Sequence, residues 1–259
     1  MRYFYQDSKK MNALLSKNKI RSLKKIPNEP SVLIVGIPGP GLIGTLSVSY
    51  LVHTLDMEIV GEIENPNTTP VVFIDEGEIF GPIRIYKNGP IFAVLSDMPI
   101  DYDVAVSFTQ SLIEFAQKNG VDIIIMPSGI HATEKNAENI KTFALSTDER
   151  LDSITYENEI PKFLTGMIAG PDATILTHLK NSPIPALILF TQCNFYFPDP
   201  ESAIHSIEII SSIIKRKIDL TEFKKQMNYL RLQGRQLMEK TLDVLQQESE
   251  SQKPPQIYK

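Results

Sequence analysis

The chain has 259 residues, of which 42% are hydrophobic, and its formal net charge is -5. This length and apolar content are sufficient for a sizeable core, and they favour one α/β domain with a small appendage. A mildly acidic chain gives no electrostatic reason to expect a nucleic-acid partner. No stretch approaches the ~20 apolar residues that a membrane span requires, so we expect no membrane partner.

Cysteine usage and the N-terminus indicate the cellular compartment. The chain has one cysteine, Cys193, so it can form no intrachain disulfide, which fits a reducing compartment. Because Cys193 lies at the end of an apolar run (186–190), we interpret it as a buried small residue and not as a nucleophile. Residues 1–7 lack the long apolar core of a signal peptide. We therefore expect a soluble, cytoplasmic protein.

Short apolar, β-branched runs alternate with helical patterns along most of the chain. In chain order, we predict a strand at 31–35, a helix at 41–55, strands at 58–63 and 71–74, a hairpin of strands at 83–86 and 91–95, a helix at 102–118, a strand at 121–126, a partly helical stretch at 163–180 and a strand at 186–190. The hairpin is predicted from Asn88-Gly89, because both residues tolerate the positive φ of tight turns. This alternation predicts an α/β fold with a largely parallel central sheet and helices on both faces.

From Pro198 onward the predicted structure is helical. Asp199 and Pro200 form a helix start, because Asp accepts from free backbone N–H groups and Pro fits the first turn, and this helix is expected to run to about Lys217. A second pattern follows Asp219, with apolar residues at steps of three and four or their multiples: Leu220, Phe223, Met227, Leu230, Leu237, Leu242 and Leu245. Such an amphipathic helix must bury one face. It either packs on the sheet domain or projects toward a partner.

The pattern divides the chain into four parts. They are a basic and polar arm at 1–30, an α/β core at 31–218, the amphipathic helix at 219–246 and a tail at 247–259. The arm carries Lys9, Lys10, Lys17, Lys19, Arg21, Lys24 and Lys25, mixed with polar residues, and is interpreted as a solvated segment.

The tail ends on a pattern typical of a docking tag. Residues 246–256 contain no apolar side chain apart from two prolines, so they are expected to form a flexible tether. Ile257, Tyr258 and Lys259 follow. The aliphatic side chain can fill a small pocket, the tyrosine adds apolar area and a hydrogen bond, and the terminal carboxylate can be captured by a lysine or by backbone N–H groups. The tail therefore predicts binding to another protein assembly.

A glycine loop offers an alternative function. Gly39, Gly41 and Gly44 match G-x-G-x-x-G between a predicted strand and a predicted helix, and Glu62 or Glu64 ends the next strand about 20 residues on. This pattern is typical of a dinucleotide-binding enzyme. Pro40, however, removes a backbone N–H where pyrophosphate needs donors. The same glycines would also permit a tight, closely packed strand-to-helix turn.

Polar side chains follow several predicted strands: Asp75, Asp97, Ser128 and His131. In an open α/β sheet, ligands bind beyond the carboxyl ends of the strands, so some of these side chains could meet there. Their spacing matches neither a metal site nor a nucleophile elbow, and Asp and Ser at strand ends are commonly caps and turn formers. We therefore predict no catalytic residues and no metal or cofactor.

Residues 32–64 resemble the opening of the proteasome assembly chaperone family. The similarity continues through GPIRIY (81–86), GVDIIIMPSG (120–129), the 166–170 segment and FPDPESA (197–203), and it covers about residues 30–225. The resemblance implies a three-layer, phosphorylase-like α/β sandwich, a homo-oligomer and no established catalysis. It also implies a packing role for the glycine loop.

Some members of that family resemble this chain further in a C-terminal hydrophobic-tyrosine-any motif, which inserts between α-subunits of the proteasome core ring. Carried over to this sequence, the motif implies that Ile257, Tyr258 and Lys259 bind the α-ring of the 20S core. The expected protein is thus a non-enzymatic proteasome-binding factor, either an assembly chaperone or an activator. The dinucleotide-binding enzyme remains the alternative.

Overall fold

The computed structural model describes residues 19–22, 31–65, 71–75, 77–131, 140–225 and 237–243. Its strands are β1 Lys19–Ser22, β2 Ser31–Gly36, β3 Glu58–Glu64, β4 Phe73–Asp75, β5 Glu78–Phe80, β6 Ile83–Asn88, β7 Ile91–Ser96, β8 Val121–His131, β9 Thr142–Ser146 and β10 Ala186–Cys193. Its helices are η1 Pro40–Leu42, α2 Ile43–Thr54, α3 Tyr102–Lys118, η2 Glu149–Leu151, α4 Asp152–Glu157, α5 Pro171–Leu179 and α6 Pro200–Ile213.

Within this part of the chain, eight strands form one mixed sheet in the order β1-β3-β6-β7-β2-β8-β10-β9. The central strands β7, β2, β8 and β10 run parallel to one another. Both flanks are antiparallel, because β6, β3 and β1 extend one side and β9 the other. The predicted α/β fold with a parallel central sheet is therefore confirmed. The predicted hairpin is also present, but its two loop residues are Gly89 and Pro90, because Asn88 ends β6 and pairs with Ile91. Gly89 has the positive φ expected of a tight turn, and Asn88 does not.

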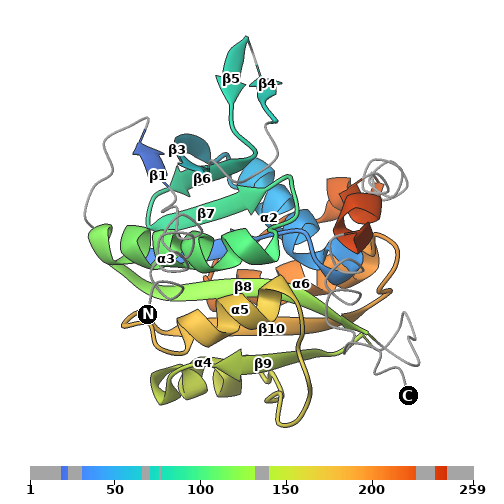
Figure 1. The fold of residues 1–259 in the computed structure, drawn as a ribbon. Helices are drawn as coiled ribbons and strands as arrows, with labels where there is room; N and C mark the ends of the chain where they lie inside the picture. The colour runs from blue at the N-terminus through green and yellow to red at the C-terminus, as the bar shows by residue number, and fades with distance from the viewer. Residues whose placement is uncertain are drawn as a thin grey trace, which may run out of the picture.

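Helices cover both faces of this sheet, as Figure 1 shows, with α3 and α5 in front of it and α6 behind. One apolar cluster joins α3 and α5 to the sheet and includes Phe108 and Ile175. The other joins α2 and α6 to the opposite face and includes Leu51 and Ile207. Each central strand is buried on both faces, which explains why β2, β7 and β10 are continuous apolar runs without alternation.

Several predicted elements differ from the observed ones. The strand predicted at 71–74 does not join the main sheet but pairs with β5 in a separate two-stranded sheet. The helix predicted to reach Lys217 ends at Ile213, and in the stretch 163–180 only Pro171–Leu179 is helical. Strand β9 and helix α4 were not predicted. Their segments are short and mix polar with apolar residues, so neither period stands out.

The two ends of the chain contribute to the body as far as they are described. Residues 19–22, within the predicted basic arm, form β1 and pair antiparallel with β3. Of the predicted amphipathic segment, residues 221–225 and 237–243 are helical, and Phe223 and Met238 are buried in the same cluster as α2. The ring of Phe223 lies 4.5 Å from that of Tyr50, centroid to centroid. These described parts pack on the sheet domain.

The edge strand β9 is covered by the segment that follows α4. The Ala144 N–H donates to the Pro161 carbonyl at 2.8 Å, and the Phe163 N–H donates to the Ala144 carbonyl at 2.8 Å. The backbone groups of β9 that face away from β10 are thus partly paired. Edge strands with unpaired backbone groups attract other strands, so this segment protects one side of the sheet.

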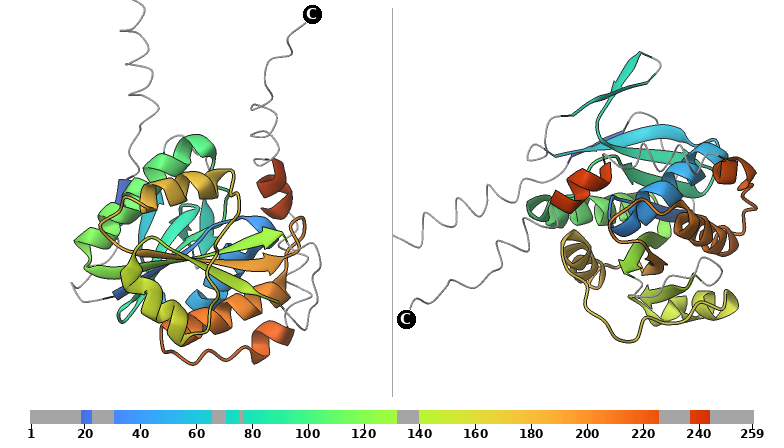
Figure 2. Two further views of the ribbon diagram at one scale, coloured as in Figure 1. Left: turned by 90° about the horizontal axis from the view of Figure 1, so that it is seen from below. Right: turned by 90° about the vertical axis from the view of Figure 1, so that its right-hand side faces the viewer.

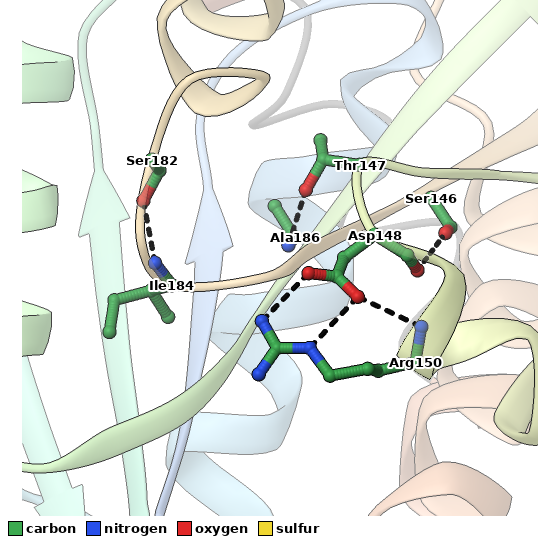
Figure 3. Close-up of polar contacts among 7 residues, drawn as sticks. All are labelled: Ser146, Thr147, Asp148, Arg150, Ser182, Ile184 and Ala186. Atoms are coloured by element: carbon green, nitrogen blue, oxygen red, sulfur yellow. Dashed lines mark hydrogen bonds and ion pairs between the residues drawn. The ribbon is translucent and has the colours of Figure 1, made fainter.

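A set of polar contacts fixes the amino end of β10 beside η2 (Figure 3). Thr147 Oγ1 accepts from the Ala186 N–H at 2.9 Å, and Ser182 Oγ accepts from the Ile184 N–H at 3.0 Å. The Asp148 carboxylate caps η2 by accepting from the Arg150 N–H, and it binds the Arg150 guanidinium through both oxygens, at 2.9 and 2.7 Å. These hydrogen bonds lower the pKa of Asp148 to about 2. The cluster is structural, because every polar group named here serves a turn or a cap.

Candidate functional site

The three residues predicted to dock, Ile257, Tyr258 and Lys259, lie outside the described residues. The candidate site that the structure does describe is the carboxyl edge of β2, β8 and β10. The glycine loop, the start of α5 and the loop after β10 meet there. This is the place where an open α/β sheet binds a ligand.

The glycine loop is packed tightly against β8 and β10. Gly41 has φ of +63°, which favours glycine, and a Cβ atom placed on it would lie 2.8 Å from Cys193 Sγ. A Cβ atom on Gly129, in β8, would lie 2.2 Å from the Pro40 carbonyl oxygen. A Cβ atom on Gly44 would lie 2.6 Å from the Ile37 carbonyl oxygen. The glycines therefore allow loop, helix and strands to approach closely.

The geometry around this loop does not suit pyrophosphate. The Leu42 N–H already donates to the Gly39 carbonyl at 2.9 Å. The Asp172 carboxylate faces the loop, since one of its oxygens lies 4.0 Å from the Cβ position of Gly39. An acidic side chain there would repel a phosphate. The packing interpretation of the loop therefore fits better than the dinucleotide one.

The strand order also argues against a dinucleotide site. In a dinucleotide-binding βαβ unit the acidic residue that binds the ribose ends a strand next to the glycine loop's own strand. Here β6 and β7 separate β3, which carries Glu62 and Glu64, from β2. Glu62 is buried beside Gly81 and Glu64 is exposed. Neither glutamate therefore lies on a strand next to that of the glycine loop, where it could bind a ribose.

Ser128 and Asp172 form a polar pair at this edge. Ser128 lies near the end of β8 and Asp172 in the first turn of α5, and the Ser128 hydroxyl donates to the Asp172 carboxylate at 2.7 Å. Burial raises the pKa of Asp172, and the Ser128 hydrogen bond offsets part of that rise. The sequence prediction included Ser128 but missed Asp172. Gly170-Pro171-Asp172 carries only a helix-start signal, which says nothing of the strand that the helix will face.

The other polar residues predicted at strand ends do not assemble with this pair. Asp97 forms an ion pair with Arg84, and burial raises its pKa despite that guanidinium. The exposed His131 lies at the far end of β8, where its ring packs edge-on to Phe195 with 6.2 Å between centroids. Asp75 belongs to the separate β4–β5 sheet. No nucleophile, base and orienting group are therefore brought together among these four predicted residues.

The loop after β10 presents aromatic side chains beside the glycine loop. Tyr196 and Phe197 are exposed, and the ring of Phe195 lies 5.3 Å from that of Tyr196. Asp199 holds this loop in place: its carboxylate accepts from the Asn194 N–H at 2.7 Å, and its own N–H donates to the Gly41 carbonyl at 2.9 Å. The carboxyl edge is thus a rigid polar and aromatic surface.

Among the described residues, no group of three or more His, Cys, Asp or Glu side chains is arranged to hold a metal ion. In the same part of the chain, no helix combines the length and the apolar character needed to cross a bilayer.

Comparison with known proteins identifies close structural relatives. The model of the PAC2 family matches residues 33–238. Pyrococcus furiosus PbaA, described as an archaeal homolog of proteasome-assembly chaperone, superposes with a TM-score of 0.79 at 18% identity, over 87% of this chain and 99% of PbaA. P. furiosus PbaB, described as an archaeal proteasome activator, superposes with a TM-score of 0.69 at 19% identity, over 90% of this chain and 99% of PbaB.

A sequence relative covers a similar extent. An uncharacterized protein of Methanocaldococcus jannaschii is 20% identical over 234 residues, which are 90% of this chain and 95% of that protein. The similarity thus extends over nearly the whole length of both chains.

Proposed function

The chain belongs to the PAC2 family, and from this premise we propose that it is a non-enzymatic proteasome-binding protein that acts as an assembly chaperone or an activator. Its partner is the α-ring of the 20S core, and it acts as a homo-oligomer in the cytoplasm. The observation that carries the proposal is the similarity over nearly the full length of the fold to PbaA and PbaB, whose descriptions concern proteasome assembly and activation.

The site geometry supports a binding role. The glycine loop is packed against β8 and β10. Asp97 forms an ion pair with Arg84, and His131 packs on Phe195. The carboxyl edge therefore brings together no catalytic set among the predicted residues. Chaperones and activators need surfaces and not reaction centres. A packed edge with a rigid aromatic loop suits that requirement.

Docking through the C-terminal residues follows from their chemistry. Ile257 and Tyr258 supply apolar area that favours burial in a partner, and Lys259 follows them. Each tail alone binds weakly, since few residues take part. In a homo-oligomer several tails engage one ring at once, and tethering raises the overall affinity by ~10²–10⁴.

The test is capture of 20S core particle by the immobilised full-length chain and by a chain that ends at Gln256. We expect the truncated chain to lose capture while its thermal unfolding stays unchanged. Tyr258→Ala should weaken capture at least ~30-fold, as for an aromatic residue that dominates an interface. Gln256→Ala is the matched control and should bind as the full-length chain does.

The contrary results are also informative. Undiminished capture by the truncated chain would show that docking uses another surface. Failure of every variant, including the full-length chain, to capture core particle or free α-subunits would overturn the proposed function itself.

A further inference from the structure

The two margins of the main sheet differ in what covers them. Strand β9 forms one margin and is partly covered by residues 161–163. Strand β1 forms the other margin, at the end of the sheet that carries β3 and the β4–β5 hairpin (Figure 1 and the right-hand view of Figure 2). A strand added from outside would therefore pair most readily at this second margin.

The resident strand β1 pairs with only part of β3. Its four residues, Lys19–Ser22, pair antiparallel with residues 61–64. Ile59 and Val60 belong to β3 but lie outside this register. A segment longer than β1 would pair with more of β3 and would form more backbone hydrogen bonds than β1 does.

A buried carboxylate lies at this margin. Glu62 is 5% exposed, and none of the residues that the structure describes donates a hydrogen bond to its carboxylate or forms an ion pair with it. Arg84 lies opposite Glu62 in the register of β6, but its guanidinium binds Asp97. A buried carboxylate without a partner is unfavourable, so Glu62 favours a cation supplied by the strand on its other side.

A second acidic residue follows on the same face of β3. Glu64 is exposed and lies two positions after Glu62, and residues two apart in a strand share a face. An added strand with cations at two alternate positions would place one opposite each glutamate. The sequence of β1 has this pattern, because the register sets Arg21 opposite Glu62 and Lys19 opposite Glu64. The margin therefore selects a strand by charge as well as by backbone pairing.

We propose that this margin is a strand-addition site for an extended, basic segment of a partner protein. The segment takes the place of β1, pairs antiparallel with β3 and sets alternate Lys or Arg residues opposite Glu62 and Glu64. Main-chain hydrogen bonds supply the affinity, and the buried Glu62 supplies selectivity for a cation. Residues 19–22 are the resident strand that the partner displaces. The site uses none of the docking residues 257–259, so it goes beyond the function proposed above.

A synthetic peptide tests the site in the full-length chain. The probe is fluorescein-labelled Thr-Val-Lys-Val-Arg-Val-Thr, which shares with β1 only the alternate Lys and Arg. Arg21→Glu in the protein sets a like charge opposite Glu62 and so weakens the resident strand. We expect this variant to bind the probe at least ~10-fold more tightly than the original chain does, measured by fluorescence anisotropy. The same variant ending at Gln256 should bind the probe equally well.

A double-mutant cycle on the Arg21→Glu chain tests the selectivity. Replacing the arginine of the probe by threonine should weaken binding at least ~10-fold when Glu62 is present. In Glu62→Gln the same replacement should change binding less than ~3-fold, because the arginine then has no carboxylate to meet. The cycle cancels any effect of Glu62→Gln on β1 itself. Glu64→Gln is the matched control: Glu64 is exposed, so the full effect of the arginine should remain.

Disulfide linkage tests the register without Arg21→Glu. A probe with cysteine in place of its lysine should link to Glu64→Cys, because the two positions are opposed. A probe with cysteine at its central valine should link at least ~10-fold more slowly, since that side chain lies on the other face of the strand. The native Cys193 is buried.

Three results overturn the proposal. The first is that the probe neither binds the Arg21→Glu chain nor links to Glu64→Cys, which would show that β1 is a fixed part of the sheet. The second is an effect of the probe's arginine that persists in full in Glu62→Gln. The third is equal linkage of the two cysteine probes, which would show that the probe binds without a register.

Discussion

At the scale of single residues, the most constrained position is the contact between Gly129, Pro40 and Cys193. A methyl group on Gly129 would overlap the Pro40 carbonyl and would also lie 2.6 Å from Cys193 Sγ. Backbone on one side and a buried side chain on the other leave no room to relax. The glycine is therefore required by packing and not by a ligand.

Gly129→Ala should lower the free energy of unfolding by about 1–3 kcal/mol, the usual range for overpacking. Gly39→Ala is the matched control, because Gly39 has an extended backbone with φ of -160° and its Cβ position is 4.0 Å from the nearest atom outside its neighbours. It should change stability by less than ~0.5 kcal/mol. Urea unfolding of both variants measures the difference. Equal losses for the two variants would mean that the loop is not packed as described.

The Ser128–Asp172 pair predicts a pH dependence of stability. Burial raises the pKa of Asp172 in the folded protein above that in the unfolded chain. As pH rises from the ordinary carboxyl range toward the raised pKa, the unfolded chain loses its proton first, so the free energy of unfolding falls through this interval. Below the ordinary pKa both states are protonated, and Asp172 contributes no pH dependence there.

Asp172→Asn should remove that fall, since an amide does not titrate and can still accept from Ser128. The difference between the two unfolding free energies, followed from acid to neutral pH, isolates Asp172 from the other buried carboxyl groups. We expect the variant to gain stability relative to the original chain as pH rises. A difference that is constant with pH would contradict the assignment.

Some residues of the candidate site could be predicted from the sequence, and others could not. The glycines and Ser128 were found because each lies in a local pattern, a strand followed by a turn. Asp172 was missed because its partner is 44 positions away, and no local pattern reports that contact. For the same reason Asp97 and His131 were placed near the site but belong to other contacts.

At the scale of elements, α6 depends on its cap. The buried Asp199 accepts from the Ser202 N–H at 3.2 Å and from the Asn194 N–H at 2.7 Å, so one carboxylate begins the helix and fixes the aromatic loop before it. Asp199→Ala should destabilise the protein by about 1–3 kcal/mol, because it leaves the buried Ser202 N–H without this partner and releases the Asn194 N–H.

The comparison is Asp148→Ala, which removes an exposed cap. Asp148 also begins a helix and also accepts from a backbone N–H, but it lies at the surface, where water replaces the lost contact. Its effect on the thermal midpoint should be clearly the smaller of the two. A larger shift for Asp148→Ala than for Asp199→Ala would show that burial does not determine the contribution of these caps.

Sequence periodicity predicted most elements of the main sheet, although β8 and β10 run to His131 and Cys193, beyond their predicted ends at 126 and 190. The helix expected at 102–118 matches α3, and strands β2, β3, β6 and β7 lie within one or two residues of their predictions. The β4–β5 pair was not predicted, because the turn between its strands has no Asn-Gly signal and each strand has three residues. Short elements owe their structure to what they contact, which a local pattern does not contain.

At the scale of the whole molecule, local sequence patterns do not determine the order of the strands in the sheet. Alternation predicted a parallel sheet with two helical faces, and it could not tell that β6 and β7 lie between β3 and β2. That order argues against the dinucleotide-binding hypothesis, because it separates Glu62 from the glycine loop. The family resemblance also implied that the glycine loop has a packing role.

The covering of β9 by residues 161–163 has a consequence for aggregation. A β-sheet can polymerise into a filament only if a free edge on one molecule meets a free edge on the next, and so on without limit. Here the chain's own backbone already pairs with Ala144, at the centre of β9, so this margin is only partly available to another strand. Two molecules joined through their β1 margins would present two such protected margins, which disfavours further growth. The fold therefore favours a finite pair over a filament in edge-to-edge association.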